Sequence, residues 1–324
     1  MTAMLSITGI TKRFPARRSL VDMIRGRPHL AVRAVEQVTL DVRKGETLGI
    51  VGESGCGKST LARCLVRLHD PDAGAISFEG VDVLSLKGPA RRTFNRRVQM
   101  VFQDPYGSLN PRMTVGDTLA EALHVHNIVP KPAIAARVRE LLDLVHLPAD
   151  AAQRHPHEFS GGQRQRIGIA RALAVEPQLI IADEPVSALD VSVQAAIVNL
   201  FMELQDRLGL TLVFITHDLR LVRHMTHRVA VMYLGRIVEI GPTADLFAKP
   251  RHPYTQALIR AVPMVKPGRR SSEAAVMGEL PSPLNPPPGC AFHPRCPIAD
   301  AACRQTVPAL EPRRGAWPVA CLKA

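Results

Sequence analysis

Short, mostly apolar runs recur along the first two thirds of the chain and predict β-strands at residues 48–51, 76–78, 98–102, 179–183 and 212–216. The last two runs are apolar along almost their whole length, which is typical of strands covered on both faces in a parallel sheet. The remaining residues before about 110 are predicted to form short strands and turns. We therefore expect a sheet with buried parallel strands.

Apolar residues at helical spacing predict helices between these strands. Leu61, Leu65 and Leu68 recur at the spacing of one helical face. Residues 134–145 carry apolar side chains along one face in the same way. Both stretches are therefore predicted to be amphipathic helices that cover an apolar core.

Two further helices are predicted at residues 163–173 and 193–208. The second lies between two predicted strands, so residues 179–216 should form a right-handed strand–helix–strand crossover. Strands that alternate with helices predict an α/β fold. The most helix-rich part is expected at about residues 114–175.

A glycine-rich loop, Gly52-Glu53-Ser54-Gly55-Cys56-Gly57-Lys58-Ser59, lies between a predicted strand and a predicted helix. Such a loop turns backbone N–H groups toward a polyphosphate, and the helix start adds positive charge. Lys58 would reach the outer phosphates, and the Ser59 hydroxyl would ligate Mg²⁺. With Thr60 added, these residues are the predicted nucleotide contacts. A glycine turn with an unrelated lysine is the alternative that this context disfavours.

Two adjacent carboxylates, Asp183 and Glu184, follow a buried predicted strand. Ligands of open α/β sheets bind at that edge, so Asp183 would hold Mg²⁺ and Glu184 would orient or deprotonate the attacking water. A solvated acidic turn is the alternative. His217 ends the next predicted strand and is expected to face the γ-phosphate. Gln103 could contact both the metal and the water, although Gln-Asp-Pro is also an ordinary turn.

A second anion-binding helix start is predicted at Ser160-Gly161-Gly162-Gln163, just before the helix at residues 163–173. Exposed N–H groups at a helix N-terminus favour an anion. One phosphate loop accounts for one nucleotide. The second anion-binding helix N-terminus therefore suggests that the chain also binds a phosphate group held by another molecule.

Composition narrows the class of protein. The 324 residues are 46% hydrophobic and 22% charged, so we expect a packed core in roughly two domains. The net charge of +12 fits nucleic acid, anionic lipid or an acidic partner, but 4% aromatic residues disfavour a base-stacking platform. No apolar run reaches the roughly 20 residues of a membrane span, and no secretory pattern begins the chain. We therefore expect a cytoplasmic protein.

The C-terminal part differs in composition from the rest. Residues 266–289 are predicted to be a proline-rich linker, and residues 290–324 a tail with cysteines at C-x5-C-x6-C-x17-C spacing: Cys290, Cys296, Cys303 and Cys321. Four thiolates suffice for a [4Fe–4S] cluster or a closed zinc site, and unligated thiols are the third possibility. Cys56 and Cys64 are expected to be bystanders, unless a helix N-terminus makes Cys56 reactive.

Several segments, in order along residues 4–265, closely resemble the motifs of ABC-type ATPase domains. In that family they are the Walker A loop, Q-loop, signature, Walker B, D-loop and switch histidine, here residues 52–59, Gln103, Ser160-Gly161-Gly162-Gln163, Asp183-Glu184, Ser187-Ala188-Leu189-Asp190 and His217. The resemblance implies an ABC-type P-loop ATPase domain over residues 1–265, with a mixed sheet and a helical subdomain at about 114–175. It also implies an aromatic residue that stacks on adenine, for which Phe14 is the candidate.

The same resemblance implies a partner ATPase. Two such domains would pair head to tail, so that Ser160–Gln163 of one closes over ATP held by Lys58 of the other. ATP binds the closed state better and shifts the population toward it. Hydrolysis would then reopen the pair.

Three segments resemble the ATP-binding subunits of oligopeptide and dipeptide importers: residues 184–194, His252-Pro253-Tyr254-Thr255 and the four C-terminal cysteines. Some members of that subfamily hold a [4Fe–4S] cluster at these cysteines. The resemblance implies ATP and Mg²⁺ as cofactors, and a paralogous ATPase subunit, two permease subunits and an extracytoplasmic solute-binding protein as partners. It places the chain on the cytoplasmic side of the inner membrane, with no nucleic acid partner.

Other functions remain open at this point. A related importer for another small solute, such as nickel or glutathione, is one alternative. A soluble nucleic-acid-associated ABC ATPase is less favoured, because the interval between Lys58 and Ser160 is too short for the coiled coils of DNA-repair relatives and shows no sustained heptads. An ATP-independent iron–sulfur or interaction module is disfavoured by the complete set of hydrolytic residues.

Overall fold

The computed structural model describes residues 3–15, 31–104, 107–261, 278–312 and 317–324. The chain forms two compact units, each assembled from separated stretches. The helical unit comprises residues 42–47 and 85–216. The glycine-loop unit comprises residues 3–41, 48–84 and 217–324.

Parallel strands form the centre of the helical unit. Strand β7 (Leu179–Asp183) lies between β6 (Val98–Val101) and β8 (Thr211–Thr216) and is parallel to both. Every residue of β7 and β8 is buried, as expected for strands covered on both faces. Helix α7 (Val191–Leu208) connects the two strands and packs on them through Phe201, whose ring lies 5.9 Å from that of Phe214.

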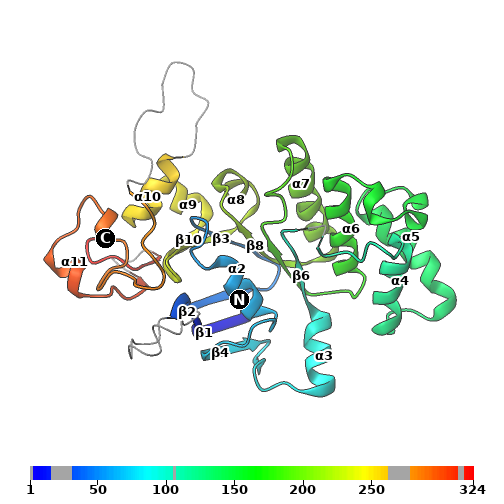
Figure 1. Cartoon of the computed structure of the whole chain (residues 1–324), viewed down its shortest axis with the longest axis horizontal. Coiled ribbons are helices and arrows are strands. Elements are labelled where there is room, and N and C mark those ends of the chain that lie inside the picture. The colour runs from blue at the N-terminus through cyan, green and yellow to red at the C-terminus, as the bar shows by residue number, and fades with distance from the viewer. Residues whose placement is uncertain (1–2, 16–30, 105–106, 262–277, 313–316) are drawn as a thin grey trace, which may run out of the picture. The chain divides into compact units, whose positions relative to one another are not determined.

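Three helices of this unit contact one another: α4 (Val115–Val125), α5 (Ile134–Leu144) and α6 (Gly161–Leu173). Figure 1 shows them side by side. Helix α3 (Gly88–Arg97) leads into β6, and short 3₁₀ turns occupy residues 131–133, 149–153 and 156–158. Thr114 caps α4, because its hydroxyl accepts from the Asp117 N–H while the Asp117 carboxylate accepts from the Thr114 N–H. This capping box fixes the start of α4 at Thr114.

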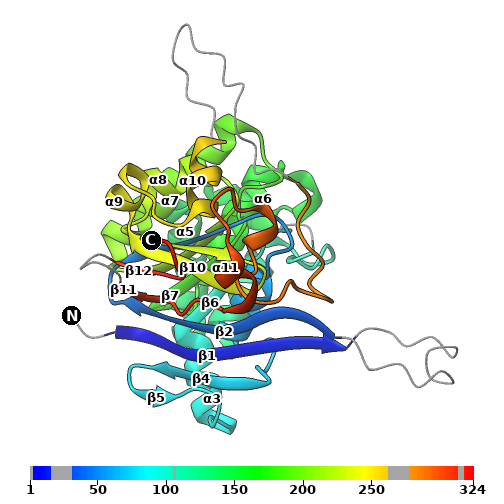
Figure 2. The same ribbon diagram turned by 90° about the vertical axis from the view of Figure 1, so that its left-hand side faces the viewer.

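One sheet of the glycine-loop unit has the strand order β2-β1-β4-β5. Its strands are β1 (Ala3–Pro15), β2 (Ala31–Arg43), β4 (Ala73–Phe78) and β5 (Val81–Asp82). Figure 2 shows the two long strands β1 and β2 lying side by side. The prediction of only short strands and turns before residue 110 was wrong here, because each of these strands runs for 13 residues.

A second set of strands carries the glycine loop and the C-terminal tail. Strand β3 (Thr47–Val51) is parallel to β9 (Arg228–Tyr233), and β10 (Arg236–Pro242) is antiparallel to β9. The tail adds β12 (Pro318–Val319) to β10 and β11 (Glu311–Pro312) to β12. The α-helices in the described residues of this unit are α2 (Lys58–Leu65), α8 (Leu219–Met225), α9 (Thr243–Ala248), α10 (Pro253–Arg260) and α11 (Ala301–Gln305).

Most predicted elements are confirmed. The five predicted strands correspond to β3, β4, β6, β7 and β8, and the predicted helices to α2, α5, α6 and α7. The prediction that Leu68 lies on the buried face of this helix was wrong. Helix α2 ends at Leu65, and Leu68 is 56% exposed. The chain leaves the helix because Arg67 adopts the left-handed conformation, with φ at 56°.

Part of the predicted organisation lies outside the described residues. The proline-rich linker at residues 266–289 is described only from Gly278 onward, and residues 313–316 of the tail also lie outside the described residues. The proposed boundaries at 265 and 290 remain predictions, as does the handedness of the β7–α7–β8 crossover. The described part of the tail belongs to the same compact unit as the glycine loop.

An aromatic cluster holds the tail in that unit. The Phe292 ring packs 5.3 Å from the ring of Tyr233 and 5.4 Å from that of Tyr254, and these two tyrosine rings lie 4.7 Å apart. All three residues are buried. Aromatic pairs contribute about 0.5–1.5 kcal/mol each beyond the area they bury. Phe292 is therefore a main anchor of the tail.

We predict that Phe292→Ala lowers the free energy of unfolding by about 3–5 kcal/mol, because it empties a site at the centre of this cluster. Trp317, the one tryptophan of the chain, lies in the tail and reports its unfolding by fluorescence during urea denaturation. Val307→Ala is the matched control, since Val307 is 51% exposed in the same tail. Equal midpoints for the two variants would contradict the anchor role.

Candidate functional site

The glycine loop follows β3 and ends at α2 in the glycine-loop unit. Gly57 precedes α2 with φ at 107°, and a Cβ there would lie 1.9 Å from the Ala34 carbonyl oxygen. At Gly52, with φ at 157°, a Cβ would lie 2.2 Å from the Met232 carbonyl oxygen. Other residues cannot fit at either position without moving backbone. The path of the loop therefore depends on these two glycines.

Lys58, the first residue of α2, folds back over the loop. Its side chain is buried, and Nζ donates to the carbonyl oxygens of Gly52 at 2.9 Å and Glu53 at 3.1 Å. Ser59 and Thr60 follow in the first turn of the helix. The ammonium and the helix N-terminus thus bring positive charge to the same loop, as an anion site requires.

Three polar residues of the helical unit come together beyond the ends of β6 and β7. Gln103 Nε2 lies 3.3 Å from Glu184 Oε2 and 3.3 Å from Ser187 Oγ. Asp183 is the last residue of β7 and is buried. The structure therefore brings together Gln103, Glu184 and Ser187, as the carboxyl edge of parallel strands predicts.

Glu184 has a strained backbone. Its φ is 45°, in the left-handed region that residues with a Cβ seldom adopt. The Glu184 N–H donates to the Ile215 carbonyl oxygen of the neighbouring strand at 2.9 Å, which holds this conformation. Such strain costs about 1–3 kcal/mol and is concentrated at functional sites. The carboxylate is thereby fixed at the turn that follows β7.

The predicted second anion site is the capped N-terminus of α6. The Ser160 hydroxyl accepts from the Gln163 N–H at 3.4 Å, and Gln163 Oε1 accepts from the Ser160 N–H at 2.9 Å. A Cβ at Gly162 would lie 2.4 Å from a methyl group of Val193, so α6 packs closely on α7. At Gly161, the Leu189 side chain would lie 3.1 Å from a Cβ. The Ser160–Gln163 turn and the loop containing Leu189 are therefore neighbours.

Two other predicted residues are placed in the glycine-loop unit. His217 is exposed and directly follows β8. Phe14 is half-buried near the end of β1, where its ring contacts the His69 ring at 5.4 Å and the Lys12 ammonium at 5.6 Å. The roles of these two residues remain predictions.

The sequence did not predict two residues that contact Glu53, the second residue of the glycine loop. The Arg295 guanidinium forms a two-pronged ion pair with the Glu53 carboxylate, at 2.8 and 2.9 Å. The Tyr254 hydroxyl accepts from the Glu53 N–H at 2.9 Å. Tyr254 lies in the His-Pro-Tyr-Thr segment that carried a family resemblance, but no local pattern links Arg295 to the loop.

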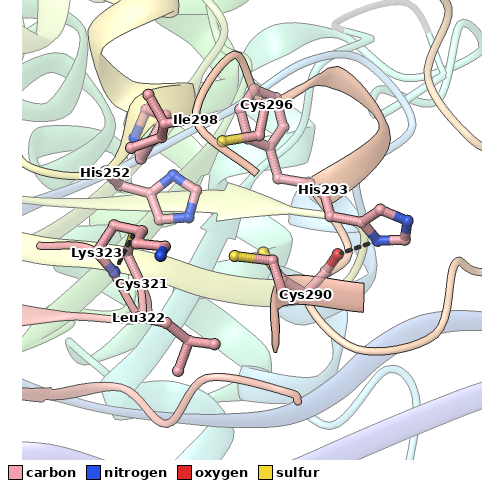
Figure 3. Close-up of a pocket in the computed structure, with 11 residues that line it drawn as sticks. His252, Cys290, His293, Cys296, Ile298, Cys321, Leu322 and Lys323 are labelled. Carbon is pink, nitrogen blue, oxygen red and sulfur yellow. Dashed lines mark hydrogen bonds between the residues drawn. The ribbon is translucent and has the colours of Figure 1, made fainter. Parts of the chain in front are cut away.

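The four C-terminal cysteines line one small pocket, which His252 also lines (Figure 3). The Cys290 N–H donates to the Cys303 carbonyl oxygen at 2.8 Å, which joins two of the segments that line the pocket. Burial raises the pKa of the Cys290 and Cys296 thiols and lowers the pKa of His252 to about 3. Among the described residues, no group of three or more His, Cys, Asp or Glu side chains is arranged to hold a single metal ion.

Within the described residues, the structure contains no helix that is both long enough and apolar enough to cross a membrane. None of the six cysteines forms a disulfide bond. Cys56 is buried, and burial raises the pKa of its thiol. Burial disfavours the Cys56 thiolate and so argues against a reactive thiol at this position.

Comparisons with known proteins agree with this geometry. Residues 35–187 match the ABC transporter family model, and residues 238–303 match the model of the oligopeptide/dipeptide transporter C-terminal region. A probable peptide ABC transporter ATP-binding protein of Sinorhizobium fredii is 53% identical over 98% of this chain and 89% of its own length. An oligopeptide transport ATP-binding protein of Bacillus subtilis is 49% identical over 98% of this chain and 96% of its own.

Two solved structures are similar over most of the chain. The first is a dimeric post-hydrolysis state of the ATP-binding cassette MJ0796 bound to ADP and Pi, with a TM-score of 0.64 and 27% identity over 74% of this chain and 99% of that one. The second is CbiO1 from Clostridium perfringens, with a TM-score of 0.65 and 26% identity over 77% of this chain and 92% of that one. The predicted α/β fold of ABC-type ATPases is confirmed.

We predict that iodoacetamide at pH 8 modifies Cys290 and Cys296 in the chelator-treated chain well before Cys56 and Cys64. Cys290 and Cys296 are half-exposed, whereas Cys56 and Cys64 are buried, and burial raises the pKa of Cys64 to about 11. A thiol with that pKa is about 0.1% thiolate at pH 8, and the thiolate is the nucleophile. Peptide mass spectrometry gives the order of modification.

The urea-unfolded chain is the control, in which the six cysteines should react at similar rates. Modification of Cys56 as early as Cys296 in the folded chain would contradict the burial argument.

Proposed function

Because this chain belongs to the ABC transporter family of ATP-binding proteins, we propose that it hydrolyses ATP to power the uptake of oligopeptides or dipeptides. The observation that carries the proposal is the match along nearly the whole chain, tail included, to proteins named for peptide transport. Uptake of nickel or glutathione is the weaker alternative, since no feature of the described residues favours it.

The glycine loop is the proposed cradle for the phosphates of ATP. Lys58 would exchange the carbonyl oxygens of Gly52 and Glu53 for phosphate oxygens, which compensate an ammonium better than neutral carbonyls do. The loop N–H groups and the start of α2 would hold the remaining phosphate charge. Phe14 is the proposed partner of adenine.

The proposed Mg²⁺ ligands are the Ser59 hydroxyl, the Asp183 carboxylate and the Gln103 amide oxygen, an assignment that rests on the order of the motifs. Hydroxyl, carboxylate and amide oxygens are the hard ligands that this ion prefers, so the donor set fits. When bound, the ion neutralises charge on the β- and γ-phosphates.

Glu184 is the proposed general base. Its carboxylate would take a proton from the water that attacks the γ-phosphorus, while the bond from that phosphorus to the β–γ bridging oxygen breaks. Gln103 Nε2, at 3.3 Å from Glu184 Oε2, would keep the carboxylate in one orientation. His217 is proposed to contact the γ-phosphate. The strained backbone at Glu184 supports a functional role for this carboxylate.

The chain is proposed to work with other subunits. Ser160-Gly161-Gly162-Gln163 would contact ATP held by a second, paralogous ATPase subunit, with the loop Ser187-Ala188-Leu189-Asp190 beside that contact. The two permease subunits and the extracytoplasmic solute-binding protein would complete the importer. The ATPase would then lie on the cytoplasmic side of the inner membrane.

We also propose that Cys290, Cys296, Cys303 and Cys321 bind a [4Fe–4S] cluster. The four thiols line one pocket, which supports a common ligand. Four cysteine thiolates are the ligand set that such a cluster takes, so these four side chains would hold it. A zinc site needs all four thiolates on one ion.

The transport proposal predicts that the importer, reconstituted with its permeases, hydrolyses ATP faster when its binding protein is loaded with a peptide. Glu184→Gln should lower this turnover by about 100-fold or more, because general-base catalysis is lost, while ATP is still bound. Glu140→Gln, an exposed glutamate of the same unit, is the control and should leave turnover unchanged.

Stimulation by nickel or glutathione but not by peptides would move the assignment to the alternative solutes. Unchanged turnover in Glu184→Gln would remove Glu184 from the role of general base.

The cluster proposal predicts a brown protein after anaerobic purification, with iron and sulfide near four per chain. Cys303→Ser should lose the visible absorbance and most of the iron, because it removes one of four ligands. Cys64→Ser is the control, since Cys64 lies outside the pocket. A colourless preparation with zinc near one per chain would support the zinc site instead, and a metal-free one would leave only free thiols.

A further inference from the structure

The C-terminal tail reaches the glycine loop through a charged contact that the catalytic scheme does not use. Arg295 lies in the 3₁₀ turn His293–Arg295, directly before Cys296, and its partner Glu53 is the second residue of the loop. The Arg295 side chain is 6% exposed and that of Glu53 is 26% exposed. Both oxygens of the carboxylate are engaged by one guanidinium, which is the strongest geometry for such a pair.

The turn that carries Arg295 is fixed by its surroundings. Phe292 is buried against Tyr233 and Tyr254, and the Arg295 N–H donates to the Phe292 carbonyl oxygen at 3.0 Å. The guanidinium lies 5.8 Å from the centre of the Tyr233 ring, which favours a cation. The ion pair with Glu53 holds the pKa of Arg295 above its usual range. Arg295 is therefore a fixed positive charge beside the loop.

A carboxylate at this position has an electrostatic cost for a phosphate site. The Glu53 carbonyl oxygen accepts from Lys58 Nζ at 3.1 Å, so Glu53 is part of the loop that surrounds the phosphate-binding ammonium. An unneutralised carboxylate there would repel the several negative charges of ATP, and in partly buried surroundings such repulsion is weakly screened. Arg295 turns the carboxylate toward the tail and offsets its charge.

We propose that Arg295 is a positioning residue for ATP: it neutralises Glu53 and thereby sets the affinity of the glycine loop for the nucleotide. The tail thus contributes to the nucleotide site without contacting it. This inference rests on the proposed role of residues 52–59 as the phosphate cradle. On this proposal, Arg295 affects ATP binding only through the charge of Glu53. A general effect of Arg295 on tail stability would not depend on Glu53.

The test measures KM for ATP and kcat in the assembled importer, together with binding of a fluorescent ATP analogue to the full-length chain. Arg295→Ala should raise KM and the dissociation constant by about tenfold, with kcat within about twofold, because one uncompensated charge weakens the loop's hold on ATP. Adding Glu53→Gln to Arg295→Ala should restore both constants to within about twofold of the wild-type values. Arg295→Lys, which keeps the charge, should fall between.

Matched variants separate the possible outcomes. Arg304→Ala removes an exposed arginine from the same tail and should leave KM unchanged. Should Arg295→Ala fail to fold, the double variant and Arg295→Lys still report the charge effect. An unchanged KM in Arg295→Ala, or a double variant as weak as the single one, overturns the proposal.

Lys58→Ala distinguishes failure of this inference from failure of the site assignment. Loss of nucleotide binding in Lys58→Ala together with a neutral Arg295→Ala would overturn only the role of Arg295. Full nucleotide binding in Lys58→Ala would overturn the phosphate-cradle assignment, and the role of Arg295 with it.

Discussion

The glycine loop is shaped around the ammonium of Lys58, and the chemistry of the chain depends on that arrangement. A buried ammonium is costly unless polar groups compensate it, and here the carbonyl oxygens of Gly52 and Glu53 contribute to that compensation. Neutral carbonyls compensate a charge less fully than an anion does. If the loop binds phosphate as proposed, phosphate oxygens would compensate the Lys58 ammonium more fully than these two carbonyl oxygens do. The path of the loop leaves no space for a Cβ at Gly57, directly before Lys58. The same backbone path therefore sets the shape of the loop and the position of the ammonium.

Glu53 distributes its polar groups between the loop and the C-terminal tail. The Glu53 carbonyl oxygen accepts a hydrogen bond from Lys58 Nζ, and the Glu53 N–H donates to the Tyr254 hydroxyl. The carboxylate forms the ion pair with Arg295. An acidic side chain at this point would otherwise add negative charge to the proposed phosphate site. The tail therefore supplies a counter-charge to this carboxylate through Arg295.

Local signals in the sequence were sufficient for much of the fold and site. Strands β7 and β8 are apolar throughout most of their length, and Gln103 and Glu184 follow adjacent parallel strands, so their proximity was predictable. Strand β1 was missed because its register against β4 shifts between Thr8 and Thr11, which breaks simple alternation. The pair of Glu53 and Arg295 joins residues 242 positions apart, and no periodic pattern records such a contact.

Both ends of the tail are anchored to the rest of the glycine-loop unit. Besides Phe292 near its start, Trp317 donates through Nε1 to Glu239 of β10, a fully buried carboxylate that also accepts from the N–H groups of Arg251 and His252. The same Glu239 thus ties the end of the tail to the segment that precedes Tyr254. The family match over residues 238–303 covers Glu239, Tyr254 and the turn that carries Arg295. These residues form one continuous packing arrangement, so the cysteine pocket and the glycine loop are parts of a single structural unit.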